Sequence, residues 1–129
     1  MADSHGHAPR GPRRLAAALG WSLQGLKAAW WHESSFRLEV MLSAGLAPAA
    51  WWLGNGPVER VLLVGSLLLV LALELVNSAI EAVIERFGAE WHPVAGRAKD
   101  MGSAAVFVGI VNAALTWGLL ALPVPAWGQ

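Results

Sequence analysis

The 129-residue sequence contains neither cysteine nor tyrosine. The lack of cysteine excludes disulfide bonds, thiolate metal sites and thiol catalysis. Charged residues are scarce at 14%, and nine basic residues balance nine acidic ones, so the chain has no overall basic field for binding nucleic acid. The motifs GxxxxGKS/T, GxGxxG and HExxH are also missing. Their absence excludes a P-loop kinase, a Rossmann enzyme and a zincin.

Hydrophobic residues make up 56% of the sequence and give it a mean hydropathy of +0.49, a composition that favours a membrane protein. Two long apolar stretches, residues 61–84 and 101–122, can each cross the roughly 30 Å hydrocarbon core of a bilayer. Residues 36–53 form a third predicted span, with two charged side chains in its first turn and Pro48 within it. The sequence therefore predicts an all-α membrane protein with three transmembrane helices, in a single membrane domain over residues 13–129.

An N-terminal segment precedes the predicted spans. Residues 13–31 place leucine and tryptophan side chains at helical spacing, while Arg14, Gln24 and Lys27 keep the segment partly polar. This pattern predicts an amphipathic helix on the membrane surface. A signal peptide is the alternative, but Gln24 and Lys27 interrupt its apolar run and no small-residue cleavage site follows. Residues 1–12 are expected to be a disordered tail.

The basic residues predict the orientation of the chain in the membrane. Seven of them lie before the first span or between the second and third, whereas Arg60 alone lies between the first and second. Because basic loops stay on the cytoplasmic side, we expect the N-terminus and the loop 86–100 in the cytoplasm and the C-terminus outside. The seven are Arg10, Arg13, Arg14, Lys27, Arg86, Arg97 and Lys99, and Arg37, at the membrane boundary, is not counted.

A stripe of polar side chains marks the second half of the second predicted span. At 100° per residue, Glu74, Asn77, Ser78, Glu81 and Glu85 share one face of a helix that is otherwise apolar. An ionised carboxylate at mid-bilayer costs on the order of 2.5 to 3.5 kcal/mol, so this stripe cannot face lipid. It faces other helices, a water-filled cleft or a bound polar ligand. A packing role for protonated or paired acids is the alternative to a functional site.

A second polar group lies where the surface helix meets the first predicted span. Glu33 and Arg37 are separated by one helical turn, which predicts either a surface ion pair or a functional role. In the functional interpretation, Glu33 and Glu81 lie at the same membrane level and together bind a divalent cation. Carboxylate oxygens, phosphate oxygens and water are the ligands that hold Mg²⁺ in phosphoryl-transfer sites.

A third polar group is the segment before the last predicted span. Arg97, Lys99 and Asp100 stand immediately before an expected helix start at Met101. Cations and helix N-termini both attract phosphate, so this group predicts a phosphate contact. The alternative is a basic loop that only anchors the helix on the cytoplasmic side.

A resemblance to a known family lies in residues 74–106, which read ELVNSAIEAVIERFGAEWHPVAGRAKDMGSAAV. This segment resembles the signature region of the bacterial diacylglycerol kinases, which are integral-membrane lipid kinases unrelated to soluble kinases. Residues 20–39, GWSLQGLKAAWWHESSFRLE, are similar to the N-terminal half of the same family, and the resemblance extends over residues 14–122. Trp21 and Trp91 stand where the family has tyrosine, so stacking is kept but a hydroxyl donor is lost.

The resemblance implies a homotrimeric lipid kinase of the bacterial inner membrane, with active sites between protomers at the cytoplasmic face. It implies transfer of the γ-phosphoryl group of ATP to membrane diacylglycerol, giving phosphatidic acid, with Mg²⁺ bound or Mn²⁺ in its place. In these roles Glu74 is the general base, Asn77 supports it, and Glu33 and Glu81 hold the metal. The implied nucleotide contacts are Arg14, Trp21, Glu33, Glu81, Glu90, Trp91, His92, Lys99 and Asp100. The implied lipid contacts are Arg14, Trp30, Ser35, Phe36, Arg37, Glu39, Glu74 and Ser103.

Two other functions stay open at this point. A sister branch of the family phosphorylates undecaprenol, although the segment GRAKDMGSAA is closer to the diacylglycerol branch. A non-enzymatic transporter could use Glu74 as its proton carrier, but a transporter needs a proton path open to both sides in turn. The outer half of each predicted span contains no acidic residue, which disfavours a transporter.

Overall fold

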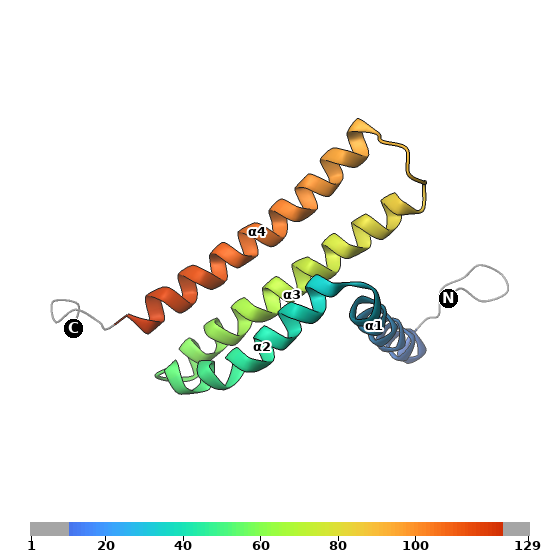
Figure 1. Ribbon diagram of the computed structural model, residues 1–129. Coiled ribbons are helices and arrows are strands. Elements are labelled where there is room, and N and C mark those ends of the chain that lie inside the picture. The colour runs from blue at the N-terminus through green and yellow to red at the C-terminus, as the bar shows by residue number, and fades with distance from the viewer. Residues whose placement is uncertain (1–10, 123–129) are drawn as a thin grey trace. The chain divides into compact units, whose positions relative to one another are not determined.

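The computed structural model describes residues 11–122, which form four helices and, within that range, no strand (Figure 1). The helices are α1 (Pro12–His32), α2 (Ser34–Leu53), α3 (Pro57–Glu85) and α4 (Pro93–Ala121). The all-α class expected from the sequence is confirmed. The chain divides after Ser34 into two compact units, the first containing α1 and the second containing α3, α4 and all but the first residue of α2. The predicted disordered tail, apart from Gly11 and Pro12, lies outside the described residues.

The first unit contains the predicted surface helix, α1, which extends one residue beyond the expected range at each end. Pro12 occupies a first-turn position, where its missing N–H costs no helical hydrogen bond. The helix ends at Glu33, whose backbone is extended (φ −115°, ψ 106°) and whose N–H donates to the Ala29 carbonyl at 2.9 Å. Leu15, one of its apolar side chains, is 75% exposed.

α2 leads through a short turn into α3, and specific contacts hold that turn. α2 continues through Pro48, although proline has no N–H for the helical ladder. Gly54 follows α2 and packs against Arg60 so closely that a Cβ atom on Gly54 would lie 2.5 Å from Arg60 Cγ. The N–H of Asn55 donates to Glu59 Oε2 at 2.8 Å. These contacts define how the chain enters α3.

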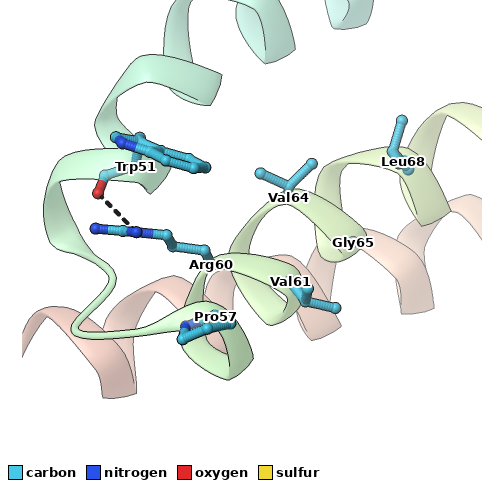
Figure 2. A pocket seen from close by; sticks show the side chains of 7 residues that line it. All are labelled: Trp51, Pro57, Arg60, Val61, Val64, Gly65 and Leu68. Carbon is cyan, nitrogen blue, oxygen red and sulfur yellow. Dashed lines mark hydrogen bonds between the residues drawn. The ribbon is translucent and has the colours of Figure 1, made fainter.

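An apolar pocket of about 490 Å³ opens beside this turn (Figure 2). The Arg60 guanidinium lies over the Trp51 ring, 4.3 Å from its centre, and Arg60 Nε donates to the Trp51 carbonyl at 3.2 Å. Cation–π contacts of this kind contribute about 0.5–1 kcal/mol at exposed sites. Arg60 therefore ties the start of α3 to the end of α2. The pocket is lined by Trp51, Pro57, Arg60, Val61, Val64, Gly65 and Leu68.

α3 and α4 run antiparallel and pack against each other (Figure 1). Gly102 and Gly109 lie on the buried face of α4, and a Cβ atom on Gly109 would lie 2.7 Å from Leu73 Cδ1. Small residues at these positions let the two helices approach closely, which is the usual basis of helix packing in membranes. Toward the other end of α4, Trp117 Nε1 donates to Ser66 Oγ at 3.1 Å.

α3 and α4, each 29 residues long, are the two helices among residues 11–122 that are long and apolar enough to cross a membrane. The span expected at 61–84 thus lies within α3, and the span expected at 101–122 lies within α4 except for its last residue, the C-cap Leu122. α2 covers the third expected span, residues 36–53, but the charges of Arg37 and Glu39 make its first half less apolar.

α4 begins at Pro93 and not at Met101, where the apolar run begins. The cap explains the earlier start: His92 is the N-cap, its Nδ1 accepts from the Val94 N–H at 3.1 Å, and Pro93 suits the first helical turn. The prediction that a helix N-terminus follows the basic segment is therefore wrong. The residues expected before that N-terminus, Arg97, Lys99 and Asp100, lie inside α4.

The close approach of α3 and α4 makes Gly102→Ala a test of their packing. A Cβ atom on Gly102 would collide with the Asn77 side chain, whereas Gly118 on the same helix has open space around it. Both replacements gain helix propensity, so their difference isolates the collision. We expect Gly102→Ala to be less stable than Gly118→Ala by about 1–3 kcal/mol, measured by denaturant titration in detergent micelles with circular dichroism. If the two variants are equally stable, α3 and α4 accommodate the added methyl group at position 102 without any loss of stability.

Candidate active site

Glu74 lies within the apolar helix α3, and only 7% of its surface is exposed. Asn77 and Ser78, about one turn further along, are buried to a similar degree, at 9% and 8% exposure. Glu81 is half-buried and Glu85 is exposed. The polar stripe therefore passes from a buried region to the accessible end of α3.

Asn77 lies where α3 and α4 pack closely against each other. A Cβ atom on Gly102 of α4 would collide with Asn77 Oδ1, so only glycine fits beside this side chain without a shift. The Asn77 amide donates from Nδ2 to Glu81 Oε1 at 3.5 Å, at the long end of hydrogen-bond distances. α4 thus positions Asn77, and Asn77 helps to orient the carboxylate of Glu81.

α2 contributes a second carboxyl group to this region. Glu39 lies close enough to Glu74 for their charges to interact. Its Oε2 atom is buried and, among residues 11–122, has no hydrogen-bond partner. Neighbouring carboxyl groups form a site where a proton can be taken up and held. The sequence marked Glu39 as a lipid contact, but nothing in its pattern showed that it approaches Glu74, because the two residues come from different helices.

The other predicted site residues lie on several separate segments. The structure brings Glu39, Glu74, Asn77 and Glu81 together within the second unit. The predicted nucleotide contacts remain distributed over α1, the connection between α3 and α4, and α4 itself. Arg14, Trp21, Trp30 and Glu33 belong to α1 or its cap, and Ser35, Phe36 and Arg37 to the first turn of α2. Glu90, Trp91 and His92 precede α4, on which Lys99, Asp100 and Ser103 are exposed.

The predicted metal ligands are two carboxylates in different units. Glu33 caps the end of α1 and Glu81 lies on α3. Within residues 11–122, no three His, Asp or Glu side chains are grouped in a way that could hold a metal ion. The chemistry of the donors still fits Mg²⁺, which prefers oxygen ligands and usually takes only one or two carboxylates, with phosphate and water completing its coordination. Glu81 is half-buried and hydrogen-bonded by Asn77, which is how carboxylate ligands are commonly oriented.

Several known proteins similar to this chain carry the name diacylglycerol kinase. The sequence model described as prokaryotic diacylglycerol kinase matches residues 20–121. A diacylglycerol kinase of Escherichia coli (strain K12) is 48% identical over 107 residues, which cover 83% of this chain and 88% of the relative. A diacylglycerol kinase of Haemophilus influenzae is 45% identical over 108 residues, covering 84% and 92%. One of Pseudomonas aeruginosa is 44% identical over 112 residues, covering 87% and 91%.

The matched range runs from the middle of α1 to the last residue of α4. It includes all of α2 and α3 and therefore the group formed by Glu39, Glu74, Asn77 and Glu81. Arg14 alone among the predicted site residues lies outside it. Because the match covers most of the chain and several relatives exceed 40% identity, this chain belongs to the prokaryotic diacylglycerol kinase family.

Proposed function

We propose that this protein is a membrane kinase that transfers the γ-phosphoryl group of ATP to the primary hydroxyl of diacylglycerol, giving phosphatidic acid. Membership of the prokaryotic diacylglycerol kinase family supports this activity. The observation that carries the site assignment is the buried carboxyl of Glu74 within a helix apolar enough to cross a membrane. A hydroxyl anchored by acyl chains in the bilayer can reach such a group.

Glu74 is the general base in this proposal, because it lies deepest on the polar stripe of α3. Its carboxylate accepts the hydroxyl proton as the lipid oxygen attacks the γ-phosphorus, and the carboxyl group of Glu39 lies beside it. Lys99 on α4 and Arg14 on α1 offset the charge of the phosphates. Phosphoryl transfer needs little covalent help from protein, so positioning and charge neutralisation supply most of the rate.

Glu33 and Glu81 are the residues that would hold Mg²⁺. When bound, Mg²⁺ would neutralise charge on the β- and γ-phosphate oxygens. Asn77 contributes by hydrogen-bonding Glu81 Oε1 and thereby limiting the rotation of that carboxylate. Trp21, Glu90, Trp91, His92 and Asp100 complete the proposed nucleotide contacts, with the lipid bound by the remaining predicted residues of α1, α2 and α4.

The acceptor lipid is the first property to test. Relatives from several bacteria carry the name diacylglycerol kinase, which supports diacylglycerol over undecaprenol. Purified protein in detergent is supplied with labelled ATP, Mg²⁺ and either diacylglycerol or undecaprenol. We expect label in the diacylglycerol product only. Label in undecaprenol alone would move the protein to the sister branch, and label in neither lipid would leave a non-enzymatic role such as proton-coupled transport.

The proposed membrane arrangement is a homotrimer of three-span protomers in the bacterial inner membrane. α2, α3 and α4 would each cross the bilayer, and α1 would lie on its cytoplasmic surface. Supporting this orientation, Arg86, Arg97 and Lys99 surround the connection between α3 and α4, whereas Arg60 alone lies in the α2–α3 turn.

Reporter fusions test this topology. A reporter after Gly88, between α3 and α4, should report a cytoplasmic position, and one after Gln129 an external position. A reporter in the α2–α3 turn, after Gly56, should report the same external position as the fusion after Gln129. If the fusions at Gly88 and Gln129 report the same side, α4 does not cross the membrane.

A further inference from the structure

Ser78 carries a buried hydroxyl that no protein group in the described range satisfies. Only 8% of the residue is exposed, and no atom among residues 11–122 hydrogen-bonds to its Oγ. A serine inside a helix usually donates to the backbone carbonyl of the preceding turn, and three other hydroxyls of this chain do so. They are Ser22 to Ala18 at 2.9 Å, Ser66 to Leu63 at 2.7 Å and Thr116 to Asn112 at 2.8 Å. Ser78 keeps both its donor and its acceptor for another group.

Ser78 stands between Glu74 and the accessible end of α3. Side chains four residues apart are neighbours on a helix, so Ser78 lies beside Glu74, about 6 Å further along the axis. Beyond Ser78 the stripe becomes accessible, since Glu81 is half-buried and Glu85 exposed. A group that leaves Glu74 toward the end of α3 therefore passes Asn77 and Ser78.

Two other buried oxygens near Glu74 also lack a partner among residues 11–122. They are Asn77 Oδ1 on α3 and Glu39 Oε2 on α2. Buried polar atoms are almost always hydrogen-bonded, either to protein or to ordered water. A buried water needs two to four polar partners, and unsatisfied buried oxygens of this kind lie on Glu39, Asn77 and Ser78. The polar group around Glu74 is thus suited to hold water inside an otherwise apolar bundle.

The proposed reaction makes one proton in each turnover. The lipid O–H bond breaks as its oxygen bonds to phosphorus, and Glu74 holds the proton as a carboxylic acid. Glu74 must lose that proton before it can accept the next one. Because only 7% of Glu74 is exposed, its direct contact with bulk water is small, and intermediate groups can carry the proton to solvent.

We propose that Ser78 relays this proton from Glu74 toward the cytoplasmic end of α3, an inference that rests on the proposed kinase function. The Glu74 acid gives its proton, directly or through one water, to Ser78 Oγ, while the Ser78 O–H passes its own proton to the next water. Each step breaks one O–H bond and forms another, so one proton per phosphoryl transfer reaches the solvent. Asn77 Oδ1 cannot donate and serves only to hold water.

Ser78→Ala tests the relay because alanine removes the O–H and leaves the helix intact. We expect kcat to fall about tenfold, less than the loss expected for removing the base itself, with KM for ATP and for diacylglycerol unchanged. Imidazole added to the assay should restore kcat, because a small diffusible base can carry the proton in place of the hydroxyl. Ser78→Thr keeps the hydroxyl and should stay close to wild-type turnover.

Ser66→Ala is the matched control, because Ser66 is a buried serine of the same helix that hydrogen-bonds Leu63 and Trp117. Imidazole should not change the turnover of the Ser66→Ala variant. A Ser78→Ala variant with wild-type kcat, with a raised lipid KM alone, or with a loss that imidazole does not restore would overturn the relay. Failure of the wild-type protein to phosphorylate any lipid would instead contradict the proposed function.

Discussion

Replacing Glu74 by glutamine is expected to lower kcat by at least about 10²-fold, the loss typical of removing a general base. Glutamine keeps the volume of the side chain and can still accept a hydrogen bond, but it cannot accept the hydroxyl proton. Glu74 is buried on α3, and the carboxyl group of Glu39 on α2 lies near it. The measurement is steady-state phosphorylation of a short-chain diacylglycerol in detergent.

Glu59→Gln is the matched control for this loss. Glu59 lies at the opposite end of α3, where its Oε2 accepts from the Asn55 N–H at 2.8 Å, an interaction that glutamine can retain. This variant should keep wild-type turnover. Nucleotide binding and size-exclusion behaviour of Glu74→Gln should match the wild type, since the proposed metal ligands are untouched. Wild-type turnover of Glu74→Gln would make Glu74 a packing residue, and loss of the native oligomer would assign the effect to assembly.

The helices could be predicted from the sequence because long apolar runs and helical periodicity are local properties. The segments expected at 13–31, 36–53, 61–84 and 101–122 each fall largely on one observed helix. The start of α4 was missed because the apolar run begins at Met101, whereas the helix is set by the His92 cap and Pro93. Hydropathy indicates which part of a helix can enter lipid, whereas the capping residues determine where the helix begins.

Only the part of the candidate site that lies on a single helix could be predicted from the sequence. The period of α3 placed Glu74, Asn77 and Glu81 on a single face, and the structure confirms that the first two are buried. The approach of Glu39 to Glu74 and the fit of Gly102 against Asn77 depend on how α2 and α4 pack on α3. The periodicity of residues along one helix does not indicate which residues of other helices they contact.

Replacing Glu81 or Glu33 by glutamine is expected to raise the Mg²⁺ concentration needed for half-maximal activity by more than about tenfold. Loss of a residue that only supports a metal ligand already costs about 10–100-fold in metal affinity, and loss of a charged ligand should cost at least as much. At position 81 glutamine can still accept from Asn77 Nδ2, so the contact between the two side chains is preserved. An increase in the Mg²⁺ requirement of this variant is therefore due to the missing negative charge.

Metal dependence is measured by removing divalent ions with a chelator and titrating Mg²⁺ or Mn²⁺ back. Activity should disappear on chelation and return with either ion, since both prefer oxygen ligands. Electron paramagnetic resonance of bound Mn²⁺ in the presence of a non-hydrolysable nucleotide gives a readout that does not depend on turnover. Glu59→Gln should leave the titration unchanged. If the Glu33 and Glu81 variants both show wild-type titrations and wild-type Mn²⁺ binding, neither carboxylate is a ligand, and the metal is held by the nucleotide phosphates with other side chains.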